Sequence, residues 1–233
     1  MSLRILHVLD HSLPLHSGYT FRTLAILREQ RARGWQTLHL TTPKQGRGAV
    51  QDEDCDGWQF HRTPNAGSEG LLTQMRLTAV RLRQIVQAAR PDVIHAHSPV
   101  LNALPSLWVG RRTGVPVVYE MRASWEDAAV DHGTTTEGSP RYRLSRALES
   151  FALRRADQIT TICEGLRLDI ASRGIPESGV TVIPNAVDVA AFRFGAAPDA
   201  QLRRALGLDG ATVLGFAGSF YAYEGIALLI EAA

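Results

Sequence analysis

Two histidines close a short apolar run near the middle of the chain. Val93 and Ile94 are followed by His95, Ala96 and His97. Successive side chains of a strand point to opposite faces, so His95 and His97 are expected on the same side of one strand. Such a pair suits a metal, but no third ligand follows at a metal-binding spacing, and we expect no metal site. We interpret His95 as a satisfied core residue and His97, which faces a crevice at the strand's end, as the catalytic candidate.

A glycine lies between the first apolar run and the helix-like segment after it. Ser17, Gly18 and Tyr19 directly precede that helix. A glycine here lets the backbone approach a phosphate or sugar, and a helix N-terminus presents free N–H groups and a positive dipole end. A single glycine does not make the three-glycine G-x-G-x-x-G fingerprint, which argues against a nicotinamide or flavin site. The alternative is a glycine that serves only the geometry of the loop.

A third polar group follows a later apolar run. Residues 120–127 combine Arg122 and Trp125 with three acids, one of which is Glu126. An arginine fork suits a phosphate or carboxylate, and an aromatic face suits a sugar ring. The alternative is a solvated loop held by local ion pairs.

Six short apolar runs are expected to position these groups. They are residues 3–9, 38–42, 93–96, 115–119, 159–162 and 180–183. Apolar runs without strict alternation are typical of parallel strands covered on both faces. Helix-period segments between them end at Gly34, Gly114 and Gly174, where a left-handed cap costs glycine least. The pattern predicts an α/β fold with a Rossmann-like, doubly wound parallel sheet, in which ligands bind beyond the carboxyl ends of the strands.

Other segments depart from this rhythm. Residues 42–57 and 121–139 are predicted to be long loops. Residues 71–90 form a helical apolar stripe flanked by four arginines and no acid. We expect this helix to cover the sheet, and the alternative is a helix that lies on an anionic membrane surface.

The pattern changes after residue 183. A turn-like linker, a short helix, an apolar strand and the beginning of a helix are predicted over 184–198, 199–208, 212–218 and 226–233. A domain that ended on these elements would leave their apolar faces unpacked. We therefore expect a first domain over 1–183, a linker over 184–198 and the start of a truncated second Rossmann-like domain over 199–233.

Composition argues against several classes of protein. The formal net charge is +2, which indicates no nucleic-acid-binding tail, and Lys44 is the only lysine among 25 basic residues, a skew typical of GC-rich bacterial genomes. The two cysteines form no CxxC pair, so no disulfide framework or zinc motif is expected. The sequence contains no P-loop, G-x-S-x-G or H-E-x-x-H motif. No signal peptide or apolar stretch of about 18 residues is found, and we expect a cytoplasmic protein or one lying on the inner membrane face.

Five motifs in order resemble the retaining family 4 of GT-B glycosyltransferases. They are residues 5–8 with Ser17-Gly18, 91–97, 156–164, 182–188, and 215–219 followed by 224–226. Within that family the sequence Gly-Ser-Phe-Tyr-x-Tyr-Glu-Gly at 218–225 is similar to the bacterial exopolysaccharide and exosortase-associated branch. The resemblance implies a Rossmann-like domain that forms the N-terminal half of a GT-B fold, followed by the beginning of a second one.

The resemblance also implies roles for individual residues. The first domain would bind a glycan or lipid-linked acceptor, with Ser17, Tyr19, Arg122, Trp125 and Glu126 as candidates, and the second would bind a nucleotide sugar, with no metal and no other cofactor. Gly18 would let the backbone approach the donor diphosphate, and His97 would lie beside the donor sugar at the catalytic centre. Asn185 and Asp188 would belong to the interdomain hinge. Gly218, Ser219 and Glu224 would begin the donor-phosphate site.

The sequence departs from the family at that phosphate site. Many members carry Arg directly after the first glycine and Lys before the second, whereas this chain has Ser219 and Glu224. An ionised Glu224 would repel a diphosphate. The paired glutamates of the family would lie beyond residue 233, so we expect transfer with retention by the complete protein and no activity of this fragment. The rivals are a non-catalytic acceptor- or partner-binding module and a nucleotide-sugar epimerase of the same architecture.

Overall fold

The computed structural model describes residues 2–46, 52–64, 70–190, 195, 197–218, 220 and 224–233. The chain divides into two compact units, residues 1–185 and 186–233. The units are described separately below.

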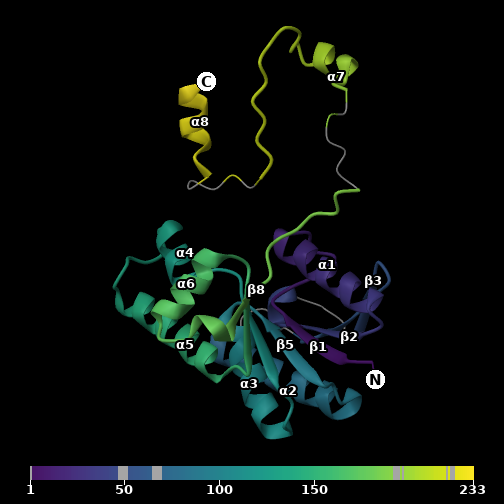
Figure 1. The fold of residues 1–233 in the computed structure, drawn as a ribbon, viewed down its shortest axis with the longest axis vertical. Coiled ribbons are helices and arrows are strands. Elements are labelled where there is room, and N and C mark those ends of the chain that lie inside the picture. The colour runs from purple at the N-terminus through teal and green to yellow at the C-terminus, as the bar shows by residue number, and fades with distance from the viewer. Residues whose placement is uncertain are drawn as a thin grey trace. The chain divides into compact units, whose positions relative to one another are not determined.

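The first unit is built on one twisted sheet, and within the described residues this sheet has eight strands (Figure 1). In chain order they are β1 (Arg4–Leu9), β2 (Gln36–Thr41), β3 (Asp52–Cys55), β4 (Trp58–Arg62), β5 (Val93–His97), β6 (Val117–Met121), β7 (Gln158–Thr161) and β8 (Val180–Val182). In space the order is β3-β4-β2-β1-β5-β6-β7-β8, and every neighbouring pair is parallel except β3 with β4. The direction of winding reverses between β1 and β5, which is where open α/β sheets bind their ligands.

Helices cover both faces of this sheet. They are α1 (Gly18–Ala32), α2 (Leu71–Ala89), α3 (Val100–Thr113), α4 (Trp125–Asp131), α5 (Pro140–Arg155) and α6 (Glu164–Ser172), with short 3-10 turns at Pro43–Gln45 and Glu177–Gly179. Leu6 and Val8 of β1 pack into the core that α2, α3, α5 and α6 share, whereas Leu9 packs with Leu24 and Leu27 of α1. Alternate residues of β1 therefore face two different cores, as a doubly wound sheet requires.

The structure confirms the predicted α/β fold. All six apolar runs form strands, and the strands that they form are parallel to their neighbours in the sheet. The predicted helix over 71–90 is also present, and its buried Leu82 and Val86 pack on the sheet while Leu72 at its beginning is 79% exposed. The sheet-covering interpretation of this helix is confirmed.

The two predicted long loops contain regular structure. The segment over 42–57 runs into the β3–β4 hairpin, and α4 lies within 121–139. Strand β3 was not predicted, because its sequence Asp-Glu-Asp-Cys has no apolar face. An edge strand does not need such a face. The turn between the strands is Asp56-Gly57, with φ values of 52° and 75°. An Asp-Gly pair is a strong two-residue hairpin signal, so the sequence did carry evidence for it.

The second unit contains two short helices among its described residues, α7 (Ala200–Ala205) and α8 (Ile226–Ala232). The prediction of a strand over 212–218 is wrong, because these residues have no regular structure and all of them are exposed. An isolated strand cannot satisfy its backbone hydrogen bonds, and the described residues of this unit provide no second strand to pair with it.

Within the described part of the chain, no helix has both the length and the apolar character needed to cross a membrane.

Gly110 of α3 allows this helix to approach β6 closely. A Cβ atom at this position would lie 2.5 Å from Val117 Cγ2 and 2.7 Å from the Val115 carbonyl oxygen. Replacing Gly110 by alanine should therefore lower the free energy of unfolding by about 1–3 kcal/mol through overpacking, as measured by urea denaturation. Gly165 in α6 is the matched control, because its added Cβ would meet only Cys163 Sγ at 3.9 Å. A Gly165→Ala variant should be as stable as the wild type or more stable, and equal stabilities of the two variants would contradict the prediction.

Candidate functional site

Buried histidines lie in register across three neighbouring strands at the point where the winding reverses. His7 of β1 is paired with His39 of β2 on one side and with His95 of β5 on the other. Because His95 and His97 are two residues apart on β5, they share the face that His7 occupies, as predicted. The rings of His95 and His97 stack with centroids 4.1 Å apart. The sheet therefore gathers imidazoles that are far apart in the sequence.

Glu120 is the buried centre of the charged groups beside these histidines. It is paired with His97 in the β5–β6 register and is 1% exposed. Its Oε1 accepts hydrogen bonds from Arg22 Nη2 at 2.6 Å and Nε at 3.1 Å, and its Oε2 accepts one from Arg122 Nε at 2.7 Å. Burial alone would raise the pKa of Glu120, but the hydrogen bond from His97 and the charge of Arg122 hold it well below its usual value. Glu120 is therefore an ionised carboxylate held between two guanidinium groups.

His97 is held entirely by protein groups. Its Nδ1 lies 2.7 Å from Glu120 Oε2, and its Nε2 lies 2.9 Å from His7 Nδ1. A carboxylate can only accept, so Nδ1 carries the proton and donates to Glu120. Arg122 Nη2 also touches this nitrogen, and because a protonated Nδ1 cannot accept, this contact is a repulsive one. Burial and the charge of Arg122 lower the pKa of His97 to about 3, so the ring is neutral near pH 7.

The environments predicted for the two histidines of β5 differ from those in the structure. The side chain of His97 was expected at a crevice, but it is 0% exposed and both of its ring nitrogens have protein partners. His95 was expected to be satisfied, but among the described residues its buried Nε2 has no hydrogen-bond partner. The physical reason is that His97 lies beside Glu120 in the sheet, whereas His95 lies beside Val118. A catalytic role of His97 stays a prediction, and in this conformation it would act through Glu120 and Arg122.

The first turn of α1 forms the exposed part of the site. Ser17 caps the helix, since its Oγ accepts the Thr20 N–H at 3.1 Å. Gly18 is exposed, and a Cβ atom added to it would meet no atom within 4 Å. Packing therefore does not require a glycine here, and the first N–H groups of the helix have no partners within the helix. This opening suits an anionic or sugar group.

Tyr19 and Arg122 form the wall next to that opening. The Arg122 guanidinium lies 4.3 Å from the centroid of the Tyr19 ring, and its Nη1 donates to the Tyr19 carbonyl at 3.2 Å. The Tyr19 hydroxyl accepts the Asp10 N–H at 3.0 Å, and burial raises the pKa of Tyr19. The Arg122 side chain is only 8% exposed, so this cation lies just beneath the surface of the site. The structure thus brings Ser17, Gly18, Tyr19 and Arg122 of the predicted set together with His97.

Arg22 connects this site to the end of the first unit. Besides Glu120, it donates to the carbonyls of Ile183 and Pro184 at 2.7 and 3.0 Å, and to Asn185 Oδ1 at 3.0 Å. Asn185, a predicted hinge residue, is therefore anchored within the first unit. Asp188, the other predicted hinge residue, belongs to the second unit and accepts the Ala190 N–H at 3.0 Å.

Trp125 and Glu126 have separate environments at the beginning of α4. Trp125 is 40% exposed and free to meet a ligand. Glu126, which was predicted to bind an acceptor, is 1% exposed, and its Oε1 accepts a hydrogen bond from Arg173 Nη2 at 2.7 Å. The acceptor-binding role of Glu126 stays a prediction, and in this conformation its carboxylate forms an ion pair with Arg173, directly after α6. The exposure of Trp125 does not indicate that Glu126 is also exposed, because consecutive helix positions point in different directions.

Removing the Glu126 carboxylate should destabilise the first unit. Arg173 is 1% exposed at its side chain and would keep only Asp169 Oδ2, at 2.6 Å, as a charged partner. We expect Glu126→Ala to lower the free energy of unfolding by about 2–3 kcal/mol in urea denaturation. Glu29→Ala is the control, because the Glu29–Arg33 pair is 72% and 59% exposed and should contribute less than about 1 kcal/mol. A loss for Glu126→Ala no larger than that of the control would contradict the structural role.

The predicted donor-phosphate residues belong to the second unit. Gly218 is exposed, and a Cβ atom added to it would lie 2.9 Å from the Phe216 ring. Glu224 is also exposed. Ser219 lies outside the described residues. Their roles stay predictions.

Three functional candidates were missed in the sequence: His7, Arg22 and Glu120. His7 lies within an expected strand, but only the register of β1 with β5 reveals that it adjoins His95. Glu120 directly follows an expected strand, which was the available signal. Arg22 lies one helical turn after Gly18, so it projects from the same helix end. A neutral imidazole, a carboxylate between two guanidinium groups and an open helix N-terminus can together orient a phosphate or sugar group.

Comparisons with known proteins agree on the architecture. The profile of the family described as "Glycosyl transferase 4-like domain" matches residues 17–186. A search of curated proteins by sequence found no significant match. Among solved structures, HepE from Anabaena in complex with UDP and glucose has 17% sequence identity and a TM-score of 0.68, covering 99% of this chain and 57% of its own.

Two further solved structures have a similar fold. A glycosyltransferase from Rickettsia africae has 12% identity and a TM-score of 0.62 over 99% of this chain and 56% of its own. A UDP-N-acetylglucosamine 2-epimerase from Rickettsia bellii has 9% identity and a TM-score of 0.52 over 78% of this chain and 44% of its own. At these identities the likeness shows the fold alone. The chain spans little more than half the length of the first two structures.

Proposed function

Because the chain belongs to the glycosyltransferase 4-like family, we propose that the complete protein transfers a sugar from a nucleotide-sugar donor to a glycan or lipid-linked acceptor. The observation that carries the proposal is the family match over residues 17–186, which runs from the Ser17 cap of α1 to the end of the first unit. The same segment contains the open helix N-terminus and the Glu120 network at the carboxyl ends of β5 and β6.

The residues of the first unit take distinct parts in this proposal. Gly18 and the N–H groups of the first turn of α1 would meet the reacting sugar or its phosphate, where leaving-group charge develops. Tyr19, Arg122 and Trp125 would border the acceptor. His97 would act as a positioning residue that holds Glu120, and thereby Arg122, in place. Gly218, Ser219 and Glu224 would begin the donor site in the second unit.

We further propose that transfer proceeds with retention, needs no metal, and serves bacterial surface polysaccharide synthesis. The resemblance in sequence supports these statements, and the UDP and glucose in the HepE structure, whose fold this chain shares, support a nucleotide sugar as the donor. The 233-residue chain alone is proposed to be inactive, because the paired glutamates of the family would lie beyond it. Exposed arginines of α2, Arg76 and Arg83, which adjoin Trp108 on the outer surface, would support a peripheral contact with the cytoplasmic membrane face.

The reaction itself is tested on the full-length protein with labelled nucleotide sugars. A transferase gives a glycosylated acceptor and free nucleoside diphosphate, and NMR of the anomeric centre reports whether configuration is retained. Release of nucleotide only in the presence of acceptor would support transfer. The absence of any product with a broad panel of donors and acceptors would contradict it.

A Gly18 series should separate ligand contact from folding. Because a Cβ atom at Gly18 meets open space, Gly18→Leu should leave the unfolding free energy within about 0.5 kcal/mol of the wild type. The larger side chain would nevertheless cover the first N–H groups of α1, so we expect transfer to fall at least about tenfold, with Gly18→Ala intermediate. Unchanged kcat/KM in the stable leucine variant would show that no substrate group approaches this helix end.

A nucleotide-sugar 2-epimerase is the second candidate, and the Rickettsia bellii enzyme of the same fold favours it. The family match is to a glycosyltransferase 4-like domain, so transfer is the better supported activity. The two activities differ in their need for an acceptor. Formation of an epimeric nucleotide sugar without acceptor would decide for the epimerase.

A further inference from the structure

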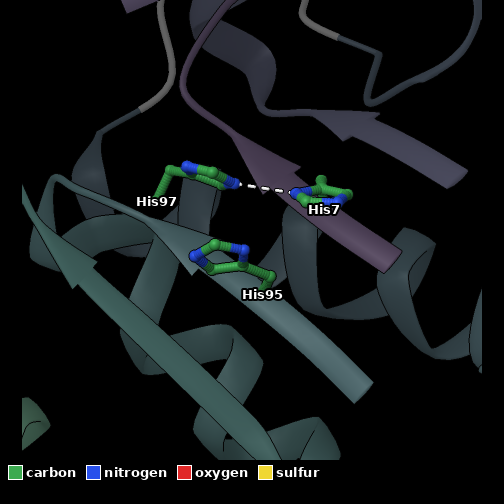
Figure 2. A group of neighbouring side chains, drawn as sticks. All are labelled: His7, His95 and His97. Carbon is green, nitrogen blue, oxygen red and sulfur yellow. Dashed lines mark hydrogen bonds between the residues drawn. The ribbon is translucent and has the colours of Figure 1, made fainter. Parts of the chain in front are cut away.

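Three imidazoles from two neighbouring strands converge beneath the site (Figure 2). One ring nitrogen from each of His7, His95 and His97 lies within 4.8 Å of the other two, and all three residues are buried. His7 Nδ1 and His97 Nε2 face each other at 2.9 Å. Figure 2 shows one nitrogen of His95 turned toward this pair and the other turned away. The sequence offered only His95 and His97, and the register of β1 with β5 supplies the third imidazole.

The outer nitrogens of the facing pair both lie against side-chain oxygens. His97 Nδ1 donates to Glu120 Oε2 at 2.7 Å. His7 Nε2 lies 2.8 Å from Gln30 Oε1, an amide oxygen that can only accept. If both outer nitrogens donate, both inner nitrogens present lone pairs to each other at 2.9 Å. Two lone pairs at that separation repel unless a positive centre lies between them.

We propose that His7 Nδ1, His97 Nε2 and the facing nitrogen of His95 bind a divalent transition-metal ion of the Zn²⁺ or Co²⁺ type. Imidazole is a preferred ligand of these ions, and metal-bound histidines usually donate their other N–H group to a carboxylate or carbonyl oxygen. Glu120 Oε2 and Gln30 Oε1 already lie against the outer nitrogens of His97 and His7. The ion would take no part in the chemistry of the proposed sugar transfer, and it would fix β1 to β5 beneath the ligand-binding edge.

Coordination requires the His7–His97 pair to open slightly and His95 to move toward it. Tetrahedral coordination with metal–nitrogen bonds of about 2.0–2.1 Å separates neighbouring nitrogens by about 3.3–3.4 Å. His7 and His97 would move apart by a few tenths of an ångström from 2.9 Å, and His95 would move inward from within 4.8 Å. The fourth position would be taken by water. Arg22 and Arg122 add positive charge around Glu120 and limit the affinity.

His39 provides the matched control for this site. Its ring centroid lies 6.3 Å from that of His7 on the same buried face. Its Nδ1 contacts the Gln59 carbonyl at 2.8 Å and its Nε2 contacts Thr37 Oγ1 at 3.0 Å, so it has no nitrogen to offer. A His39→Gln variant therefore removes a buried imidazole without removing a ligand.

The experiment is a Co²⁺ titration of the 233-residue chain, purified without a polyhistidine tag and stripped with a chelator. We expect about one ion per chain, the intense visible absorption of four-coordinate Co²⁺, and displacement of that ion by Zn²⁺. His95→Gln should weaken binding more than about 100-fold, and Gln30→Leu, which removes only the partner of His7, about tenfold. His39→Gln should bind as the wild type does. Circular dichroism establishes that each variant is folded.

A second measurement does not depend on any variant. Imidazole ¹⁵N resonances of the wild-type chain should show His7 bound through Nδ1 and His97 through Nε2 after Zn²⁺ is added. Absence of visible absorption together with ¹⁵N shifts unchanged by excess Zn²⁺ would overturn the proposal. Binding that a folded His95→Gln variant retains in full would overturn it as well.

Discussion

Replacing Glu120 by alanine should lower the free energy of unfolding of the chain by about 3–5 kcal/mol, because it leaves two buried guanidinium groups without their counterion. The side chains of Arg22 and Arg122 are only 10% and 8% exposed, so water cannot replace the carboxylate. His97 would also lose the acceptor of its Nδ1 proton. Urea denaturation followed by circular dichroism measures the loss.

Two further variants make the Glu120 prediction specific. Glu164→Ala removes a carboxylate that is 65% exposed and pairs with Arg167 at 2.6 Å, and it should cost no more than about 1 kcal/mol. Combining Glu120→Ala with Arg22→Met should cost less than the sum of the two single changes, since the double variant no longer buries the charge of Arg22 without its partner. Strict additivity, or a loss for Glu120→Ala as small as for Glu164→Ala, would show that the network does not hold the site together.

The fold was predictable from the sequence because buried parallel strands need apolar residues on both faces. Residues 3–9 and 159–162 were found on that basis alone, and the glycine caps marked the helix ends. The β3–β4 hairpin was not found, because the acidic Asp52–Cys55 strand lies at the edge of the sheet and has no apolar pattern. The strand expected over 212–218 has the apolar pattern but is not formed. An apolar run forms a strand only where another strand is available to pair with it.

The site was predictable only within single strands. The period of two correctly placed His95 and His97 on one face, but which of them is satisfied depends on β6, whose Glu120 pairs in register with His97. The register of β1 with β5, which brings His7 against His95, is a property of the whole sheet. The burial of Glu126 likewise depends on Arg173, 47 residues away in the chain. Contacts between side chains that are far apart in the sequence could therefore be found only in the structure.

The buried histidines should make the first unit strongly sensitive to acid. Burial lowers the pKa of His39 to about 4 and that of His97 to about 3, and it also lowers those of His7 and His95. The positive charges of Arg31 near His39 and of Arg122 near His97 act in the same direction, whereas Glu120 opposes the shift of His97. An unfolded chain takes up protons on these rings below about pH 6.5, while the folded chain does not.

Stability must therefore fall as the pH drops from about 6.5 toward the folded-state pKa values, because the unfolded state binds more protons throughout this range. At pH 5 each ring shifted this far removes about 2 kcal/mol, so His39 and His97 together remove about 4 kcal/mol, and His7 and His95 add to that loss. We expect the urea midpoint, measured in the presence of a chelator, to fall steeply between pH 7 and pH 5. His39→Gln should reduce the pH dependence of the unfolding free energy by about one proton. A midpoint that stays constant down to pH 5 would mean that these rings take up protons equally in the folded and the unfolded chain, and it would contradict the prediction.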